Sequence, residues 1–85
     1  MDVGVEISLY PLDEQYIEPI KDFIERINAE GDLRIITNSM STQIFGDYDK
    51  VMQRLVREVR TSFANREREQ GKAVFVLKIL GPMTT

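Results

Sequence analysis

The ten residues Asn38-Ser39-Met40-Ser41-Thr42-Gln43-Ile44-Phe45-Gly46-Asp47 decide how this chain folds. They contain a polar turn, then a short strand over Thr42–Phe45, then Asp47, which is well placed to cap the start of a helix. A connector as short as residues 39–41 forces the strands on either side of it to be antiparallel neighbours. The stretch is therefore the pivot between two similar halves of one chain.

Before this pivot the sequence predicts a strand, a helix and a second strand. Residues 3–9 alternate between apolar and other side chains, which is typical of a half-buried strand, and Pro11 ends it. A helix should begin near Gln15–Glu18 and stop at Gly31. The second strand covers Leu33–Asn38, which is rich in β-branched residues. The apolar stripe of the helix consists of Tyr16, Ile17, Ile20, Phe23, Ile24 and Ile27.

After the pivot the sequence predicts a second helix and a fourth strand. Between Arg54 and Arg68 arginines interleave with glutamates, which is typical of a solvated helix face. Residues 65–70 are polar all round and predict a solvated last turn or a frayed end. Gly71 closes the helix, and Lys72–Leu80 form the fourth strand. The apolar side of the helix is expected to carry Tyr48, Met52, Leu55, Val56, Val59 and Phe63.

The order βαββαβ with short links predicts a ferredoxin-like α+β fold, as one domain over residues 1–85. Right-handed crossovers place the first and third strands in the middle of a four-stranded antiparallel sheet, with both helices on one face. A chain of this size buries only roughly 60–65% of its unfolded surface. Association with further subunits would supplement so thin a core.

Composition narrows the function. The chain has no cysteine and no histidine, so disulfides, thiolate zinc sites and thiol nucleophiles are excluded, and the usual general base is missing. A net charge of −3 does not indicate a protein that binds nucleic acid. The N-terminus lacks the pattern of a secretory signal, and no apolar run approaches the length of a membrane span. We therefore expect a cytoplasmic protein that is not an enzyme and has neither nucleic acid nor membrane as a partner.

The fourth strand is apolar on both of its sides, and Lys78 is the only charge between Ala73 and Leu80. Two helices cover only one face of the sheet, so the second apolar face favours a cover from outside the chain. We expect a homodimer or homotetramer built by sheet-to-sheet packing. The alternative is a monomer whose scattered valines face solvent.

Two groups of polar residues could form a site. Glu6, Ser8 and Tyr10 share the polar side of the first strand, and Lys78 is expected beside Glu6. A Glu6–Lys78 pair either neutralises two charges or lines a polar pocket, and the structural interpretation is favoured. The second group lies in the central turn, where its members either form the turn or bind a ligand, the former being favoured. It consists of Asn38, Ser39, Ser41 and Thr42.

Two segments resemble the YkoF-like thiamine-binding domains. They are Ile-Ser-Leu-Tyr-Pro-Leu over residues 7–12 and Met-Ser-Thr-Gln-Ile-Phe-Gly-Asp-Tyr-Asp over residues 40–49. The usual pattern of that family has a Tyr-Pro-Leu strand end and Ser/Gly-Thr-x-x-x-Gly-Asp after the central turn, and Tyr10, Thr42 and Gly46 match it. The resemblance implies a ferredoxin-like subunit of a dimer or tetramer. It also implies binding of thiamine or its hydroxymethyl-aminopyrimidine precursor without catalysis and without a cofactor.

The chemistry of this ligand is compatible with the candidate residues. An aminopyrimidine is flat and would stack on an aromatic wall such as Tyr10, Phe45 or Tyr48. Glu6 would accept from the amino group, and polar side chains near the turn would satisfy the ring nitrogens. The rival hypothesis is a regulatory or scaffolding module that binds another protein through its open sheet face. The predicted ligand-binding residues are Glu6, Ser8, Tyr10, Asn38, Thr42, Phe45 and Lys78.

Overall fold

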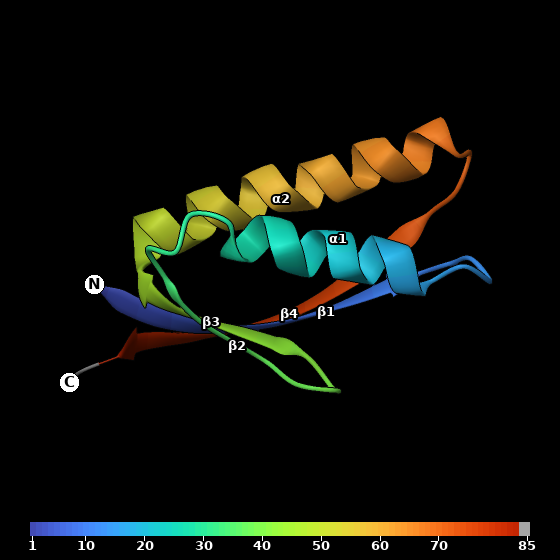
Figure 1. Ribbon diagram of the computed structural model, residues 1–85. Helices are drawn as coiled ribbons and strands as arrows, with labels where there is room; N and C mark the ends of the chain where they lie inside the picture. The colour runs from blue at the N-terminus through green and yellow to red at the C-terminus, as the bar shows by residue number, and fades with distance from the viewer. Residues whose placement is uncertain (84–85) are drawn as a thin grey trace.

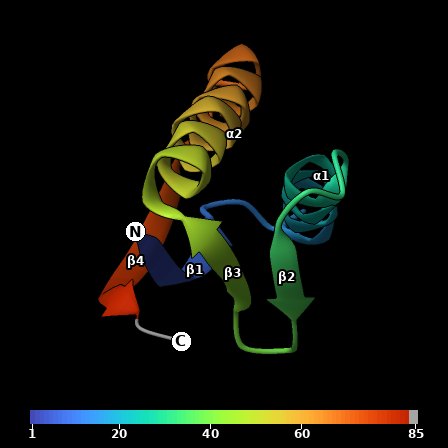
Figure 2. The same ribbon diagram turned by 90° about the vertical axis from the view of Figure 1, so that its left-hand side faces the viewer.

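The computed structural model describes residues 1–83 and confirms the predicted ferredoxin-like α+β fold; Thr84 and Thr85, the end of the predicted domain, lie outside the described residues. The four strands form one antiparallel sheet in the order β2-β3-β1-β4, so the first and third strands are central as predicted. Both helices lie on one side of it (Figures 1 and 2). The elements are β1 (Asp2–Pro11), α1 (Ile17–Asn28), β2 (Arg34–Thr37), β3 (Thr42–Asp47), α2 (Tyr48–Arg68) and β4 (Ala73–Met83).

The element ends differ from prediction by a few residues. β4 continues three residues past the expected end at Leu80, because Met83 still lies opposite Asp2 at the start of β1. β2 is shorter than expected, since Asn38 already belongs to the turn. Asp47 caps α2 as predicted, and its side chain accepts from the backbone N–H of Lys50. These shifts leave the predicted topology unchanged.

The apolar core lies between the sheet and the helices. Val3, Val5 and Ile7 alternate along β1 and point toward the helices, as the period-two pattern requires. Phe75 of β4 lies between Phe23 and Phe63, with ring centroids 5.2 Å and 5.4 Å apart respectively. The buried core residues are Val3, Val5, Ile7, Phe23, Ile27, Ile44, Val51 and Leu55.

A polar stripe on α2 is buried, and the prediction of a solvated face was wrong for it. Its members recur at every fourth residue, which places them on one side of the helix, toward α1. Arg26 of α1 donates to Glu58 Oε1 at 2.7 Å and to Ser62 Oγ at 2.6 Å. The charges of the stripe stay buried because they are paired. Glu58 and Arg54 find partners on α1 and in the link after it, and Arg66 finds one in the link before it. It consists of Arg54, Glu58, Ser62 and Arg66, each between 4% and 6% exposed.

The last turn of α2 is solvated as predicted at residues 67–70, which are exposed, but Arg66 within it is buried. Arg66 donates to Asp13 Oδ2 at 3.0 Å and to Glu69 Oε2 at 2.8 Å. Gly71 makes this arrangement possible, because a methyl group there would overlap the Arg66 guanidinium. A single buried arginine thus ties the link after β1 to the last turn of α2.

Apolar side chains remain exposed along β4, an edge strand. On the outer face of the sheet, the face away from the helices, Val76 and Leu80 are 49% and 68% exposed. On the inner face Leu77 and Ile79 are also exposed, because α2 does not cover them. Part of the predicted apolar side of α2 is exposed as well, namely Tyr48, Val56 and Phe63.

No helix within residues 1–83 combines the length and the apolar character needed to cross a membrane.

Candidate ligand-binding pockets

The predicted site residues fall on two sides of the sheet. Glu6, Ser8 and Tyr10 alternate with the buried residues of β1 and therefore belong to its outer face. Lys78 lies directly opposite Glu6, as predicted, and its Nζ is 3.6 Å from Glu6 Oε1. Because the Lys78 side chain is 81% exposed, this pair contributes at most about 1 kcal/mol. Glu6 also accepts from Ser41 Oγ at 3.2 Å.

Phe45 belongs to a different cluster. Its ring lies against Gly4, where an added Cβ would be 3.1 Å from a ring carbon, and the Arg34 guanidinium is 5.0 Å from the ring centroid. Gly4 is six residues from Tyr10 along the extended strand β1, so the two aromatic rings do not face each other. The structure does not bring Phe45 together with the residues of the central turn.

A pocket of about 360 Å³ lies between α1 and the β2–β3 hairpin, and we call it the hairpin pocket. Its origin is a difference in strand length. The pairing of β1 with β3 ends at Ile7 opposite Thr42, whereas β1 continues to Pro11. In Figure 1 the tip of the β2–β3 hairpin and the far end of β1 point away from each other. The notch beside the second half of β1 is the floor of the pocket, and four residues of α1 and its approach supply an apolar wall: Tyr16, Ile20, Phe23 and Ile24.

The hairpin pocket collects four of the seven predicted residues, Ser8, Tyr10, Asn38 and Thr42. The other three, Glu6, Phe45 and Lys78, do not line it. Sequence reasoning missed Tyr16 and Ile20, which lie on the helical stripe and therefore read as core.

Hydrogen bonds within the turn fix what Asn38 can offer a ligand. Its side-chain oxygen accepts from the backbone N–H of Met40 at 2.7 Å and of Ser41 at 3.1 Å. Its own backbone N–H donates to the Ser41 carbonyl at 3.0 Å. Asn38 is therefore a turn former, as the favoured interpretation held. Because the oxygen is held by the turn, the amide NH₂ group is the part of this side chain left for a ligand.

The hydroxyl groups of the pocket divide into acceptors and donors. Ser8 Oγ donates to the Met40 carbonyl, and Ser41 Oγ donates to Glu6, so both retain only lone pairs for a ligand. The Thr37 and Thr42 hydroxyls are 3.1 Å apart, and in such a pair one proton stays uncommitted. The pocket can thus accept through the serines and donate through Asn38 and one threonine.

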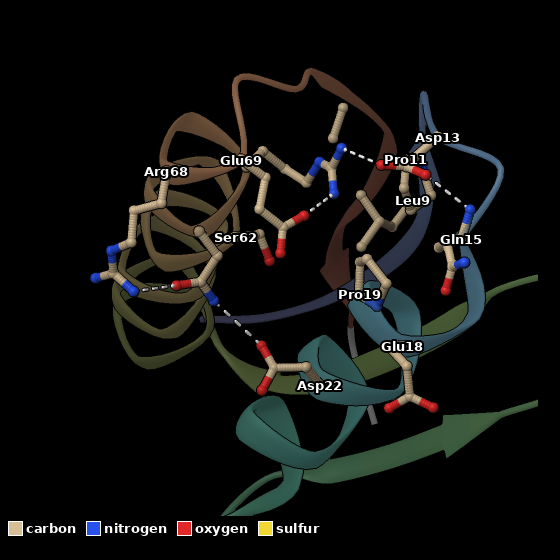
Figure 3. A pocket seen from close by; sticks show the side chains of 13 residues that line it. Leu9, Pro11, Asp13, Gln15, Glu18, Pro19, Asp22, Ser62, Arg68 and Glu69 are labelled. Atoms are coloured by element: carbon tan, nitrogen blue, oxygen red, sulfur yellow. Dashed lines mark hydrogen bonds and ion pairs between the residues drawn. The ribbon is translucent and has the colours of Figure 1, made fainter.

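A second cavity of about 480 Å³, the helix-end cleft, lies between the start of α1, the end of α2 and the link after β1 (Figure 3). The Gln15 backbone N–H and the Arg66 guanidinium hold the pKa of Asp13 below its usual value. Within residues 1–83 the Nε of Arg66 is the one buried side-chain nitrogen or oxygen without a hydrogen-bond partner. Nothing in the sequence indicated this cleft, because each of its charged residues is of a type common on any protein surface. They are Asp13, Glu18, Asp22, Arg66, Arg68 and Glu69.

The sequence matches the family described as "YKOF-related Family" over residues 2–76, nearly the whole chain. The chain belongs to the YKOF-related family. The resemblance seen in the sequence is thereby confirmed. A search of curated proteins gave no match for this YKOF-related chain.

Solved structures share the fold of the YKOF-related chain. A candidate thiamine biosynthesis/salvage protein from Thermotoga maritima is 22% identical, with a TM-score of 0.78; the match covers 93% of this chain and 82% of that one. A hypothetical protein from Methanocaldococcus jannascii is 26% identical over 99% of this chain and 84% of the other, with a TM-score of 0.79. A Streptococcus pneumoniae protein is 15% identical over 98% and 89%, with a TM-score of 0.84.

Proposed function

We propose that this chain binds thiamine or its hydroxymethyl-aminopyrimidine moiety in the hairpin pocket, in the cytosol and without catalysis. Membership of the YKOF-related family and the name of the Thermotoga maritima structure support a thiamine-related ligand. The observation that carries the proposal is the hairpin pocket itself. Its volume lies in the range of small-molecule sites, and it joins an apolar wall to a few converging polar groups.

The polar groups of the pocket complement an aminopyrimidine. The ring carries an exocyclic amino donor and ring nitrogens that accept. Asn38 NH₂ would donate to a ring nitrogen, and the oxygens of Ser8 and Ser41 would accept from the amino group. The flat ring would pack against Tyr16 and Ile20. Glu6 changes role in this proposal: it holds the Ser41 hydroxyl instead of contacting the ligand.

The proposal includes a homo-oligomer, either dimer or tetramer. Val74, Val76 and Leu80 on the outer face of β4 are 46%, 49% and 68% exposed, which leaves an apolar strip on an edge strand. A second copy laid on this face would bury it. Sedimentation equilibrium of the protein and of Val76→Lys tests this part: association should be lost in the variant, and a monomeric wild type at micromolar concentration contradicts it.

Calorimetric titration with thiamine and with the free pyrimidine tests the ligand. Absence of heat from both at millimolar concentration refutes the proposal. Asn38→Asp is the most informative variant, because it keeps the oxygen that accepts from the turn and removes the amide donor. A buried acceptor left unpaired costs about 1–3 kcal/mol, so affinity should fall roughly 5- to 150-fold. Gln53→Glu, at an exposed position of α2 outside the pocket, makes the same change in charge and should bind like the wild type.

The rival function is a module that binds another protein through the outer face, and the exposed strip on β4 supports it. Under that hypothesis Asn38→Asp has no effect on the partner, whereas Val76→Lys abolishes binding. The two functions are thus separated by one variant in the turn of the hairpin pocket and one on β4.

A further inference from the structure

The lining of the hairpin pocket differs in charge from the cleft beside it. All fifteen residues that line the hairpin pocket are uncharged. By contrast, six of the thirteen residues that line the helix-end cleft carry a charge. The two cavities share Leu9 and Pro11, so the difference arises over a short distance at the end of β1.

From this difference, and resting on the function proposed above, we infer that the hairpin pocket selects unphosphorylated ligands: the neutral pyrimidine and thiamine itself, and not their phosphate esters. A phosphate group brings at least one full negative charge, and a buried charge without a partner is strongly disfavoured. Proteins usually offset it with arginine, lysine or a helix N-terminus. The fifteen lining residues include neither an arginine nor a lysine.

The N-terminus of α1 is the remaining group that could attract a phosphate, since Tyr16 and Ile20 belong to the pocket wall. Its first turn opposes this role. Glu18 places a carboxylate at the positive end of the helix, and Pro19 has no backbone N–H to donate. A phosphate at this helix start would meet a like charge and one donor fewer than usual.

The side chains around the hairpin turn point to the same selection. Glu6 accepts from Ser41, which lines the pocket, and therefore places a carboxylate immediately behind the turn. Lys78 is paired with that carboxylate from the outer face, and its side chain is largely in solvent. Of these charged groups near the pocket, Glu6 and Glu18 are carboxylates, and the ammonium of Lys78 is already paired with Glu6. This arrangement suits a neutral ring or the cationic thiazolium of thiamine and offers a phosphate ester no free cation among them.

Titration calorimetry with four ligands tests the inference: the hydroxymethyl-aminopyrimidine, its monophosphate, thiamine and thiamine diphosphate. We expect each phosphate ester to bind at least tenfold more weakly than its parent compound. If the esters bind as tightly as the parents or more tightly, the inference is overturned while the proposed function stands. If none of the four ligands binds, the proposed function itself fails, and the inference with it.

A charge variant gives a second measurement. Met40 lines the pocket and is 81% exposed, so Met40→Lys adds a cation at the rim without disturbing the core. The ratio of ester to parent dissociation constants should fall several-fold in this variant. Gln53→Lys, at an exposed position of α2 outside the pocket, makes the same change in net charge and should leave the ratio unaltered. An unchanged ratio in Met40→Lys would show that the discrimination is not electrostatic and would overturn the inference.

Discussion

Replacing Glu58 by glutamine tests whether the buried polar stripe stabilises the fold. Its carboxylate accepts from Arg26 and from Arg57, each at 2.7 Å. The Arg26 bond is part-buried, and such a hydrogen bond between charged groups contributes about 1.5–3 kcal/mol. Arg57 is half exposed, so its share is at most about 1 kcal/mol.

Glutamine keeps the size of the side chain and one acceptor oxygen. It would retain roughly half of the Arg26 bond, because neutral hydrogen bonds are about half as strong as charge-assisted ones. It would also turn an NH₂ group toward Arg57. The expected loss is therefore about 2 kcal/mol in the free energy of unfolding. For a domain of this length that corresponds to a fall in Tm of about 8–16 °C.

Urea unfolding followed by circular dichroism at pH 7 and fixed protein concentration measures the loss. Glu67→Gln is the matched control, since Glu67 lies on the same helix and is exposed; it should differ from the wild type by less than about 0.5 kcal/mol. If Glu58→Gln and Glu67→Gln unfold at the same urea concentration, the stripe does not stabilise the fold and the reasoning is wrong.

The pH dependence of the difference provides an internal check. Burial raises the pKa of Glu58, but the hydrogen bonds from Arg26 and Arg57 together lower it by more. The pKa of Glu58 in the folded protein therefore lies below the usual 4.5. The stabilisation is then complete above pH 4.5 and is lost as the pH falls through the lower folded-state pKa. The wild type should therefore lose its advantage over Glu58→Gln in acid.

Three further predictions concern stability. The Arg54 guanidinium holds the pKa of Asp32 at about 2. The wild type should therefore lose stability as the pH falls from 3.8 toward 2. Asp32→Asn should show a shallower pH dependence in acid titrations followed by fluorescence or circular dichroism. Gly31 has φ +67° with no atom within 4 Å of an added methyl, so Gly31→Ala should cost about 1 kcal/mol through backbone strain alone, and Gly31→Asn less, by urea unfolding. Gly71→Ala should cost about 1–3 kcal/mol by overlap with Arg66, and a double-mutant cycle should show a much smaller cost in an Arg66→Met background.

The topology could be predicted from sequence because its signals are local. The alternation along residues 3–9 predicts a strand with one buried face, and the polar turn at 39–41 predicts two antiparallel neighbouring strands. Both features are present in the structure. The buried stripe could not be predicted. Arginine and glutamate at a spacing of four occur equally on solvated faces, and only the position of α1 decides which face is buried.

Part of the candidate site could also be predicted from the sequence. Asn38 and Ser8 were found because a turn and the polar side of a strand place polar groups at predictable positions. The wall of the pocket was not found, because Tyr16 and Ile20 have the same spacing as core residues. Phe45 was predicted as a possible aromatic wall for the ligand, but its position on β3 places it over Gly4 instead.

Strand length connects the two surfaces that the proposals use. β1 has ten residues, but its pairing with β3 stops at Ile7, while its pairing with β4 reaches Pro11. The half of β1 that is not paired with β3 therefore forms the notch of the hairpin pocket on one side and pairs with residues 73–76 of β4 on the other. Tyr10 belongs to both: it lines the pocket and lies directly opposite Val74. In the proposed oligomer, a second copy that covers the outer face of β4 would consequently contact the same tyrosine that lines the hairpin pocket, so the proposed site would border the proposed interface.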